Sequence, residues 1–515
     1  MEQRQRHAEA DSDKLLEELV EERRKHLGQD AATACQDVRW GLALSGGGIR
    51  SATFCYGLLT ALAKARVLWR FDLMSTVSGG GYIGAMVGRM ALNTRTAQAL
   101  QTQLADDGAA SHHRKWLRAN SRYLIPRGSQ DWLYAVVTFL RNLAGVHIEL
   151  GMLGMLLGCV LGGIDLFAWW SLDQWIKDPA LQPAQTAPLD VWNLVSPWPT
   201  LWLLLPLPVL WATVAAILYW YMPAGPSRPE LADERRQWVT EQLALALRVG
   251  VAVLLLGAID WVAWRIANKP SQLVLLGVGF TVILAALRTL LPLVQQGGAT
   301  VSDFLRQRLP LMLDLAGKFG ILMMLIFWTS VVHAIATRYV WSADLEQVDF
   351  FHAVQALALL SAGVLAWLLV SGRSLDFLNR SSLHHFYRAR LSHAYLGAAN
   401  PDRRADSKVT HVHTADDVAM PKYAPHAHGG PVHVINVCIN QTYQRHGLHN
   451  LDRQGELMSL VGPGHYRVEG RGWQPLAPDS SASLGTWMAV SGAAAAPGLG
   501  SATRPGLAAM LTTLG

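Results

Sequence analysis

The sequence predicts an α/β protein with a doubly wound, mostly parallel sheet that is interrupted by an α-helical transmembrane insertion of about six spans. Three observations lead to this fold class. Short apolar runs alternate with glycine clusters between residues 40 and 91. Apolar segments of about 20 residues recur between 150 and 370, and short apolar runs are found again after residue 370. A helical span needs about 20 apolar residues to cross the hydrocarbon layer, so the middle of the chain differs in kind from its two flanks.

The composition supports a membrane protein. Hydrophobic residues make up 51% of the 515 residues and charged residues only 16%, against about 25% charged residues in soluble domains. This excludes a disordered chain, a disulfide miniprotein and a nucleic-acid arm. The net charge of +6 fits an anionic membrane surface better than a DNA groove, and we expect no nucleic-acid partner. The four cysteines are far apart, which suggests neither a zinc site nor a disulfide framework.

The first flank predicts a charged N-terminal helix within residues 1–37, at 11–27, followed by the first half of the α/β domain at 38–147. A strand from Trp40 to Ser45, a glycine turn and a helix over 51–65 precede a strand from Phe71 to Val77. A second glycine turn then leads into a helix that ends at about residue 91. This βαβ order predicts parallel strands, and ligands in such sheets bind at the carboxyl ends of the strands.

The transmembrane helical block is expected at residues 148–371. Six spans are predicted, at 150–170, 197–221, 249–267, 272–294, 319–337 and 351–370. The loops 222–248 and 295–318 and both flanks are rich in Lys and Arg, which by the positive-inside rule places both ends of the block in the cytoplasm. We therefore expect a multi-pass inner (cytoplasmic) membrane protein with cytoplasmic catalytic halves. Asp165, Asp260 and Arg288 interrupt the spans; we expect Asp165 and Arg288 to reach the interface and Asp260 to bond a neighbouring helix.

The second half of the α/β domain is expected at residues 372–515. A strand is predicted at 431–439, and a further short element at 485–492. Five histidines crowd the stretch that leads into the predicted strand at 431–439. Their spacing fits no helix, so we expect a solvated loop and no metal site; the residues are His411, His413, His426, His428 and His433.

Ser78 is the candidate nucleophile. It stands in Thr76-Val77-Ser78-Gly79-Gly80 between a predicted strand and a predicted helix, which is the setting of a nucleophile elbow. Thr76 replaces the first glycine of G-x-S-x-G, so a plain Ser-Gly turn stays an alternative. The consecutive glycines Gly46, Gly47 and Gly48 at the preceding turn can direct several backbone amides at one oxyanion. A dinucleotide fingerprint fits less well, because Ser51 occupies the third glycine position.

The pair of motifs Gly46-Gly47-Gly48-Ile49-Arg50-Ser51 and Ser75-Thr76-Val77-Ser78-Gly79-Gly80-Gly81 resembles the patatin-like phospholipase family, in particular a bacterial membrane-embedded branch. Three further blocks agree with it, at 116–127, 379–391 and 487–494. The resemblance covers about 38–145 and 373–515. It implies a Ser/Asp dyad that hydrolyses lipid acyl esters without a cofactor. Ser78 would be the nucleophile, Gly79 and Gly80 the elbow, and Gly46, Gly47, Gly48 and Arg50 the oxyanion loop.

In the family the Asp of that dyad lies in an Asp-Gly-Gly or Asp-Gly-Ala motif beyond the block that 487–494 resembles, and no such motif follows that block in this sequence. Asp452 and Asp479 are the last two aspartates of the sequence, and neither precedes a glycine. The catalytic Asp is therefore unknown, and the second half is expected to be truncated before it. A split enzyme with a complementing chain, or an oligomer, stays open.

The function expected from these features is that of a membrane-bound serine lipid acyl hydrolase, whose substrate is a membrane phospholipid or another acyl lipid. A catalytically silent membrane scaffold or lipid-binding relative is the alternative, because a serine without a base is a poor nucleophile. An intramembrane serine protease is disfavoured because Ser78 lies outside every apolar span.

Overall fold

The chain folds into two compact units. Residues 1–142 and 379–508 form the first unit, and residues 143–378 form the second. The computed structural model describes residues 2–27, 38–106, 108, 111–121, 129–176, 200–221, 229–267, 271, 275, 303–340, 350–373, 383–404, 413–440, 455–469, 471–477, 482–493, 506 and 508.

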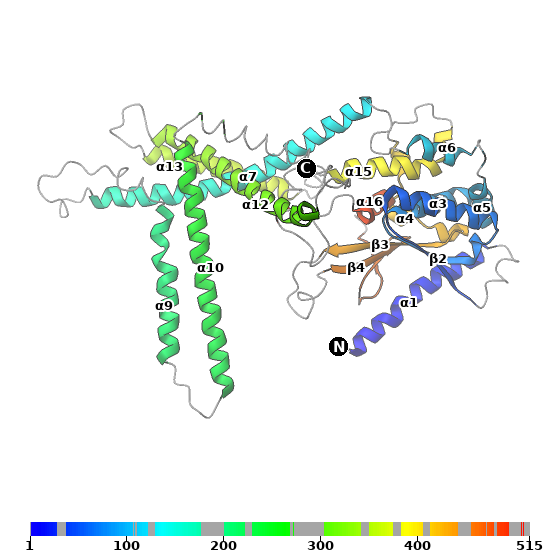
Figure 1. Cartoon of the computed structure of the whole chain (residues 1–515), viewed down its shortest axis with the longest axis horizontal. Coiled ribbons are helices and arrows are strands. Elements are labelled where there is room, and N and C mark those ends of the chain that lie inside the picture. The colour runs from blue at the N-terminus through cyan, green and yellow to red at the C-terminus, as the bar shows by residue number, and fades with distance from the viewer. Residues whose placement is uncertain are drawn as a thin grey trace, which may run out of the picture. The chain divides into compact units, whose positions relative to one another are not determined.

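The first unit holds all the described strands (Figure 1). Its principal elements are α1 (Glu2–Lys25), β1 (Trp40–Leu44), α3 (Gly48–Lys64), β2 (Phe71–Thr76), α4 (Gly79–Thr94), α5 (Ala97–Ala105), α6 (His112–Ala119), α15 (Leu383–Leu391), β3 (Val432–Asn440), β4 (Gly455–Val461), β5 (His465–Val468), β6 (Gln474–Pro475) and α16 (Leu484–Gly492). Between α15 and β3 the described residues form one π-helical turn and five short 3₁₀ helices, of which η8 (Pro425–His428) is the last.

The described sheet has the order β1-β2-β3-β4-β5-β6. Strands β1, β2 and β3 are parallel, as predicted for the βαβ unit, whereas β3 through β6 pair antiparallel. The prediction of a mostly parallel sheet is therefore right only for the three strands that surround the glycine turns. Antiparallel neighbours need only a short connection, whereas parallel ones need a crossover, and three residues join β4 to β5.

Helices cover both faces of this sheet. On one face α1 packs Leu19 and Val20 against Val432 and Val461, and all four side chains are buried. On the other face α3, α4 and α16 share the main core with β1 to β4. Figure 1 shows α1 in dark blue along one side of the strands and α3, α4 and α5 along the other. The centre of this layer is α4, whose residues from Gly79 to Ala91 are all buried.

The element from Leu484 to Gly492, whose type the sequence left open, is a helix. The prediction of a solvated loop is wrong for three of the five histidines. His433 lies in β3 with 1% of its surface exposed, and His426 and His428 lie in η8. His433 lies within the predicted strand at 431–439, and its position in β3 faces the core. His411 lies outside the described residues.

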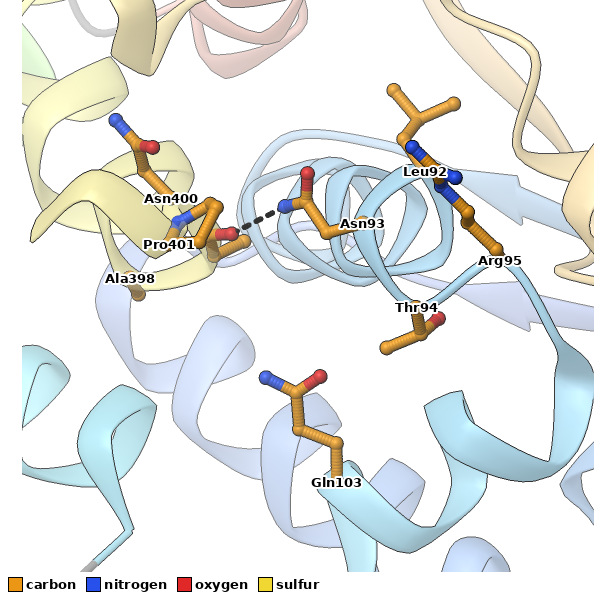
Figure 2. A pocket seen from close by; sticks show the side chains of 9 residues that line it. Leu92, Asn93, Thr94, Arg95, Gln103, Ala398, Asn400 and Pro401 are labelled. Carbon is orange, nitrogen blue, oxygen red and sulfur yellow. Dashed lines mark hydrogen bonds between the residues drawn. The ribbon is translucent and has the colours of Figure 1, made fainter. Parts of the chain in front are cut away.

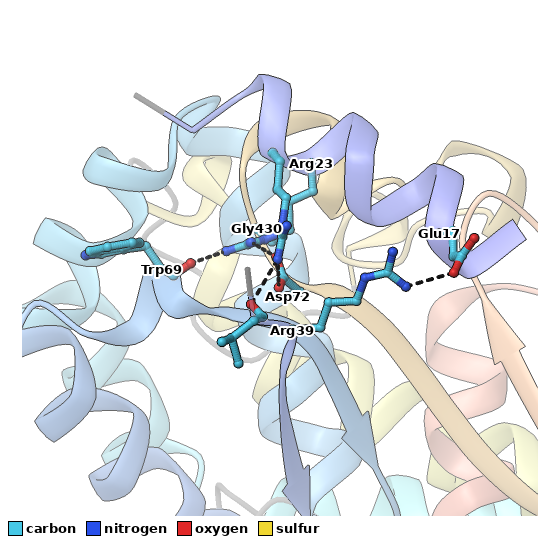
Figure 3. Close-up of polar contacts among 8 residues, drawn as sticks. Glu17, Arg23, Arg39, Trp69, Asp72 and Gly430 are labelled. Atoms are coloured by element: carbon cyan, nitrogen blue, oxygen red, sulfur yellow. Dashed lines mark hydrogen bonds and ion pairs between the residues drawn. The ribbon is translucent and has the colours of Figure 1, made fainter. Parts of the chain in front are cut away.

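A buried ion pair fastens α1 to the sheet (Figure 3). Arg23 donates from Nη1 to Asp72 Oδ1 at 2.7 Å, and both side chains are 0% exposed. Arg23 also donates to the carbonyl oxygens of Trp69 and Gly430, and Arg24 donates to the second oxygen of Asp72. Because burying a charge without partners is costly, these contacts hold the end of α1 at the start of β2.

The second unit is helical. Its elements are α7 (Ser129–Ile176), of which residues from Leu143 onward belong to this unit, η2 (Thr200–Leu204), α9 (Pro206–Tyr221), α10 (Pro229–Ala267), α12 (Asp303–Val340) and α13 (Phe350–Gly372). Five helical segments in the described residues are long and apolar enough to cross a membrane: 143–168, 200–221, 234–267, 314–336 and 351–372. They coincide with five of the six predicted spans. The remaining predicted span, 272–294, lies outside the described residues apart from position 275, and Arg288 lies there too.

Two details of this unit differ from the prediction. Residues 229–248, predicted as part of a loop, continue α10 as helix. Asp165 does not reach an interface with solvent: its side chain is 1% exposed and accepts a hydrogen bond from Trp264 Nε1. Asp260 does bond a neighbouring helix, through His333 of α12. Outside these contacts, large apolar side chains of α9, α10 and α13 are widely exposed, as a lipid-facing surface requires.

The buried ion pair gives a test of how α1 is held. The change Asp72→Ala leaves Arg23 buried without its partner, and we expect a loss of about 3–5 kcal/mol from the first unit. Thermal unfolding in detergent and hydrogen exchange over residues 14–25 should show a lower midpoint and weaker protection of α1. The control Arg39→Ala breaks the exposed pair with Glu17 and should change stability by about 1 kcal/mol at most. Equal effects of the two changes would contradict this account.

Candidate active site

Ser78 occupies a strained backbone position between β2 and α4. Its φ of 50° and ψ of −121° lie in a region that residues with a Cβ atom rarely adopt. The residue is the N-cap of α4, although its side chain does not cap the helix. The side chain therefore makes no capping bond, and the residue is partly exposed. This is the geometry of a nucleophile elbow.

The two glycine turns interlock beside Ser78. A Cβ atom at Gly79 would collide with the carbonyl oxygen of Gly48, and one at Gly80 with the carbonyl oxygen of Leu44. A Cβ atom at Gly46 would lie 3.0 Å from the Cβ of Ser78 and 3.6 Å from its Oγ. Only glycine permits so close an approach of the two backbones. The structure thus brings together the two motifs that the sequence analysis singled out.

Two helix N-termini meet at this point. Helix α3 begins at Gly48 and α4 at Gly79, and the first N–H groups of a helix have no intrahelical acceptor. The positive φ values of Gly47 (148°) and Gly48 (62°) turn the chain sharply from β1 into α3. Since helix N-termini favour negative charge, the arrangement suits an oxyanion next to Ser78. The role of Gly46, Gly47 and Gly48 as an oxyanion loop stays a prediction.

A polar network from distant segments supports the elbow. The Ser78 N–H donates to Ser491 Oγ at 2.9 Å, and Ser491 Oγ donates to the carbonyl oxygen of Asn436 at 2.7 Å. The Asn436 amide in turn donates to Ser75 Oγ and to the Thr76 carbonyl, while Ser459 donates to its Oδ1. The network links β2, β3, β4 and α16, so the strained residue is held from three neighbouring elements.

A second network explains why threonine replaces the first glycine of the elbow motif. Thr76 Oγ1 lies 2.8 Å from His433 Nε2, and Tyr423 OH lies 2.7 Å from His433 Nδ1. Burial lowers the pKa of His433 to about 3 and raises the pKa of Tyr423. His433 is therefore neutral near pH 7 with both ring nitrogens occupied. It anchors the end of β2 and does not serve as a base for Ser78.

The other predicted groups of the site are less well placed. Arg50 is exposed at the start of α3, and no hydrogen bond or ion pair joins it to another described residue. Asp452 and Asp479 lie outside the described residues. Within the described part of the chain, no carboxylate or imidazole is hydrogen-bonded to Ser78 Oγ.

A polar cavity of about 440 Å³ lies at the other end of α4 (Figure 2). Its lining includes Asn93, Arg95 and Asn400, and Asn93 Nδ2 donates to the Ala399 carbonyl at 2.7 Å. Asn93 follows Ser78 by 15 residues, which at 1.5 Å per residue places it about 22 Å along the helix. The cavity is therefore separate from the elbow.

Sequence reasoning missed Asn436, Ser491 and Ser459. Asn436 stands between the apolar Ile435 and Val437 in a predicted strand, which was a usable signal for a polar structural role. Ser491 gives no such signal. Its position depends on α16, which Ser483 caps and Asp417 fastens through Gly485 N at 2.8 Å.

Comparison with protein-family models, with curated proteins and with solved structures found no match to this chain.

The close approach of the two glycine turns predicts opposite outcomes for two Gly→Ala changes. Gly79→Ala places a methyl group against the Gly48 carbonyl and should cost about 1–3 kcal/mol or displace the elbow. Gly57→Ala, the control, adds a methyl to α3 in open space and should stabilise the unit by about 0.5–1 kcal/mol. Thermal unfolding of both variants measures the difference. The account fails if Gly79→Ala is as stable as the wild type.

The neutral state of His433 predicts a pH dependence. Because its folded pKa of about 3 lies below the unfolded value of about 6.5, the unfolded chain binds the extra proton between these limits. Stability is therefore complete above about pH 6.5 and decreases as the pH falls toward 3. His433→Gln should flatten the decline measured between pH 6.5 and 4.5. Changing the exposed His413 to Gln should leave it unchanged; equal slopes in all three proteins would refute the role of His433.

Proposed function

We propose that this protein is a membrane-bound serine hydrolase of lipid acyl esters, with a patatin-like arrangement of Ser78 and the glycine turn. The observation that carries the proposal is the strained Ser78 at the junction of β2 and α4, beside Gly46 and the start of α3. Strain at one residue persists only where the surroundings hold it, and such residues cluster at active sites. The position at the carboxyl ends of parallel strands agrees with ligand binding there.

The chemistry follows from the elbow. Ser78 Oγ attacks the carbonyl carbon of the ester and loses its proton to a base, and the carbonyl oxygen becomes an oxyanion near the N–H groups that begin α3 and α4. The tetrahedral intermediate collapses when the bond to the alcohol breaks, and the alcohol leaves with a proton. Water then hydrolyses the acyl-enzyme, which releases the fatty acid and restores Ser78.

An acyl lipid is the proposed substrate because the same chain carries five helices apolar enough to span a membrane. A lipid ester is then present at high local concentration wherever the protein resides. The excess of Lys and Arg in the predicted inner loops supports an inner-membrane location with both flanks in the cytoplasm.

A catalytically silent relative is the second candidate. Within the described residues, Ser78 Oγ has neither a carboxylate nor an imidazole as a hydrogen-bond partner. Without a base, the site keeps its fold, but the serine loses most of its nucleophilicity. Such a protein would bind acyl lipids or act as a membrane scaffold.

Active-site labelling distinguishes the two candidates. The full chain in detergent is treated with a fluorophosphonate, whose phosphorus forms a bond to an activated serine oxygen as fluoride leaves. We expect one adduct per chain on Ser78, located by mass spectrometry of the peptide, and none in Ser78→Ala.

A matched control is Ser121→Ala, which removes an exposed serine of the same unit and should leave the labelling unchanged. Absence of any Ser78-dependent adduct in a folded wild-type chain would contradict the hydrolase and favour the silent relative.

A further inference from the structure

Three buried titratable side chains meet inside the helical unit. Asp165 of α7, Asp260 of α10 and His333 of α12 are 1%, 2% and 0% exposed. Each offers one ligand atom, and these atoms all lie within 4.8 Å of one another. The cluster belongs entirely to the second unit and plays no part in the chemistry of Ser78.

The cluster is positioned by its neighbours. His333 Nε2 lies 2.7 Å from Asp260 Oδ1, Trp264 donates its indole N–H to Asp165 Oδ2, and the His333 ring stacks on Trp264 with centroids 4.0 Å apart. An outer hydrogen bond such as the one from Trp264 to Asp165 fixes the orientation of a metal ligand. Three helices therefore hold the three side chains in one place.

Hydrogen bonding leaves the cluster incompletely satisfied. His333 Nδ1 is buried without a hydrogen-bond partner, as is Thr329 Oγ1, one helical turn earlier on α12. A buried polar atom without a partner costs free energy. Neutral imidazole is the form of histidine that binds metals, and the Nε2 side of the His333 ring is the side that faces Asp260.

The charges of the cluster favour a cation as its ligand. Two carboxylates this close repel each other in an apolar interior, and among the described residues His333 is the only basic side chain paired with either of them. A divalent cation makes the group of two aspartates and one neutral histidine electrically neutral, which removes most of the cost of burying the charges.

We propose that Asp165, Asp260 and His333 form a binding site for one divalent transition-metal ion of the zinc class within the helical unit. A metal at the centre of three atoms spaced up to 4.8 Å apart is at most about 2.8 Å from each, so movements of under about 1 Å give the 2.0–2.2 Å bonds of zinc. The imidazole ligand favours such a metal over Mg²⁺ or Ca²⁺. Three protein ligands leave a fourth position for water.

Metal binding by the full chain in detergent tests the proposal. After treatment with a chelator, the protein is titrated with Co²⁺ and Zn²⁺, and bound metal is measured by elemental analysis and by the Co²⁺ absorption spectrum. We expect about one ion per chain and a rise in the unfolding temperature on adding Zn²⁺ to the metal-free protein. The near-isosteric changes Asp165→Asn, Asp260→Asn and His333→Gln should each weaken binding at least tenfold.

The matched control is Asp314→Asn, which alters another buried carboxylate of α12, one that pairs with Lys318. It should bind metal like the wild type. The proposal is overturned if the folded wild type binds neither ion, or if the three cluster variants bind as tightly as Asp314→Asn; the cluster would then share protons rather than hold a metal. The wild-type titration alone decides the matter if a variant does not fold.

Discussion

The contact between the two glycine turns, one after β1 and one after β2, determines how the elements of the first unit pack around Ser78. The carbonyl oxygens of Leu44 and Gly48 occupy the space that a Cβ atom would need at Gly80 and Gly79. This contact sets how closely α4 approaches β1 and α3, and Ser78 with its positive φ directly precedes it. The buried α4, the three parallel strands and the two helix N-termini at the elbow all depend on that approach.

The strain at Ser78 is offset by contacts from residues far away in the sequence. Ser491 accepts from the Ser78 N–H across 413 residues, and His433 reaches Thr76 across 357 residues. A segment that follows the whole helical insertion therefore completes the elbow. This dependence explains how one α/β unit tolerates a long insertion: its two sequence halves meet in the central strands β2 and β3.

Local patterns were sufficient to predict β1, α3, β2 and α4, because each alternates or repeats with the period of its own structure. The glycine runs located the elbow because they mark the sharp turns between these strands and helices. The sequence did not indicate the antiparallel return of β4 to β6, since strand direction depends on the connections rather than on the strands. The partner of Thr76 and the meeting of Asp165, Asp260 and His333 were equally hidden, because they depend on which helices and strands become neighbours. The predicted histidine loop was wrong at His433 because this residue also lies within the predicted strand at 431–439, where its position faces the core.

The central claim is that Ser78 is an activated nucleophile directed at lipid esters. The most direct measurement is the release of free fatty acid from phospholipid vesicles by the purified full chain, compared with Ser78→Ala under the same conditions. The account predicts steady release by the wild type and none above background by the variant. Equal release by the two proteins, or none by a folded wild type, would contradict it.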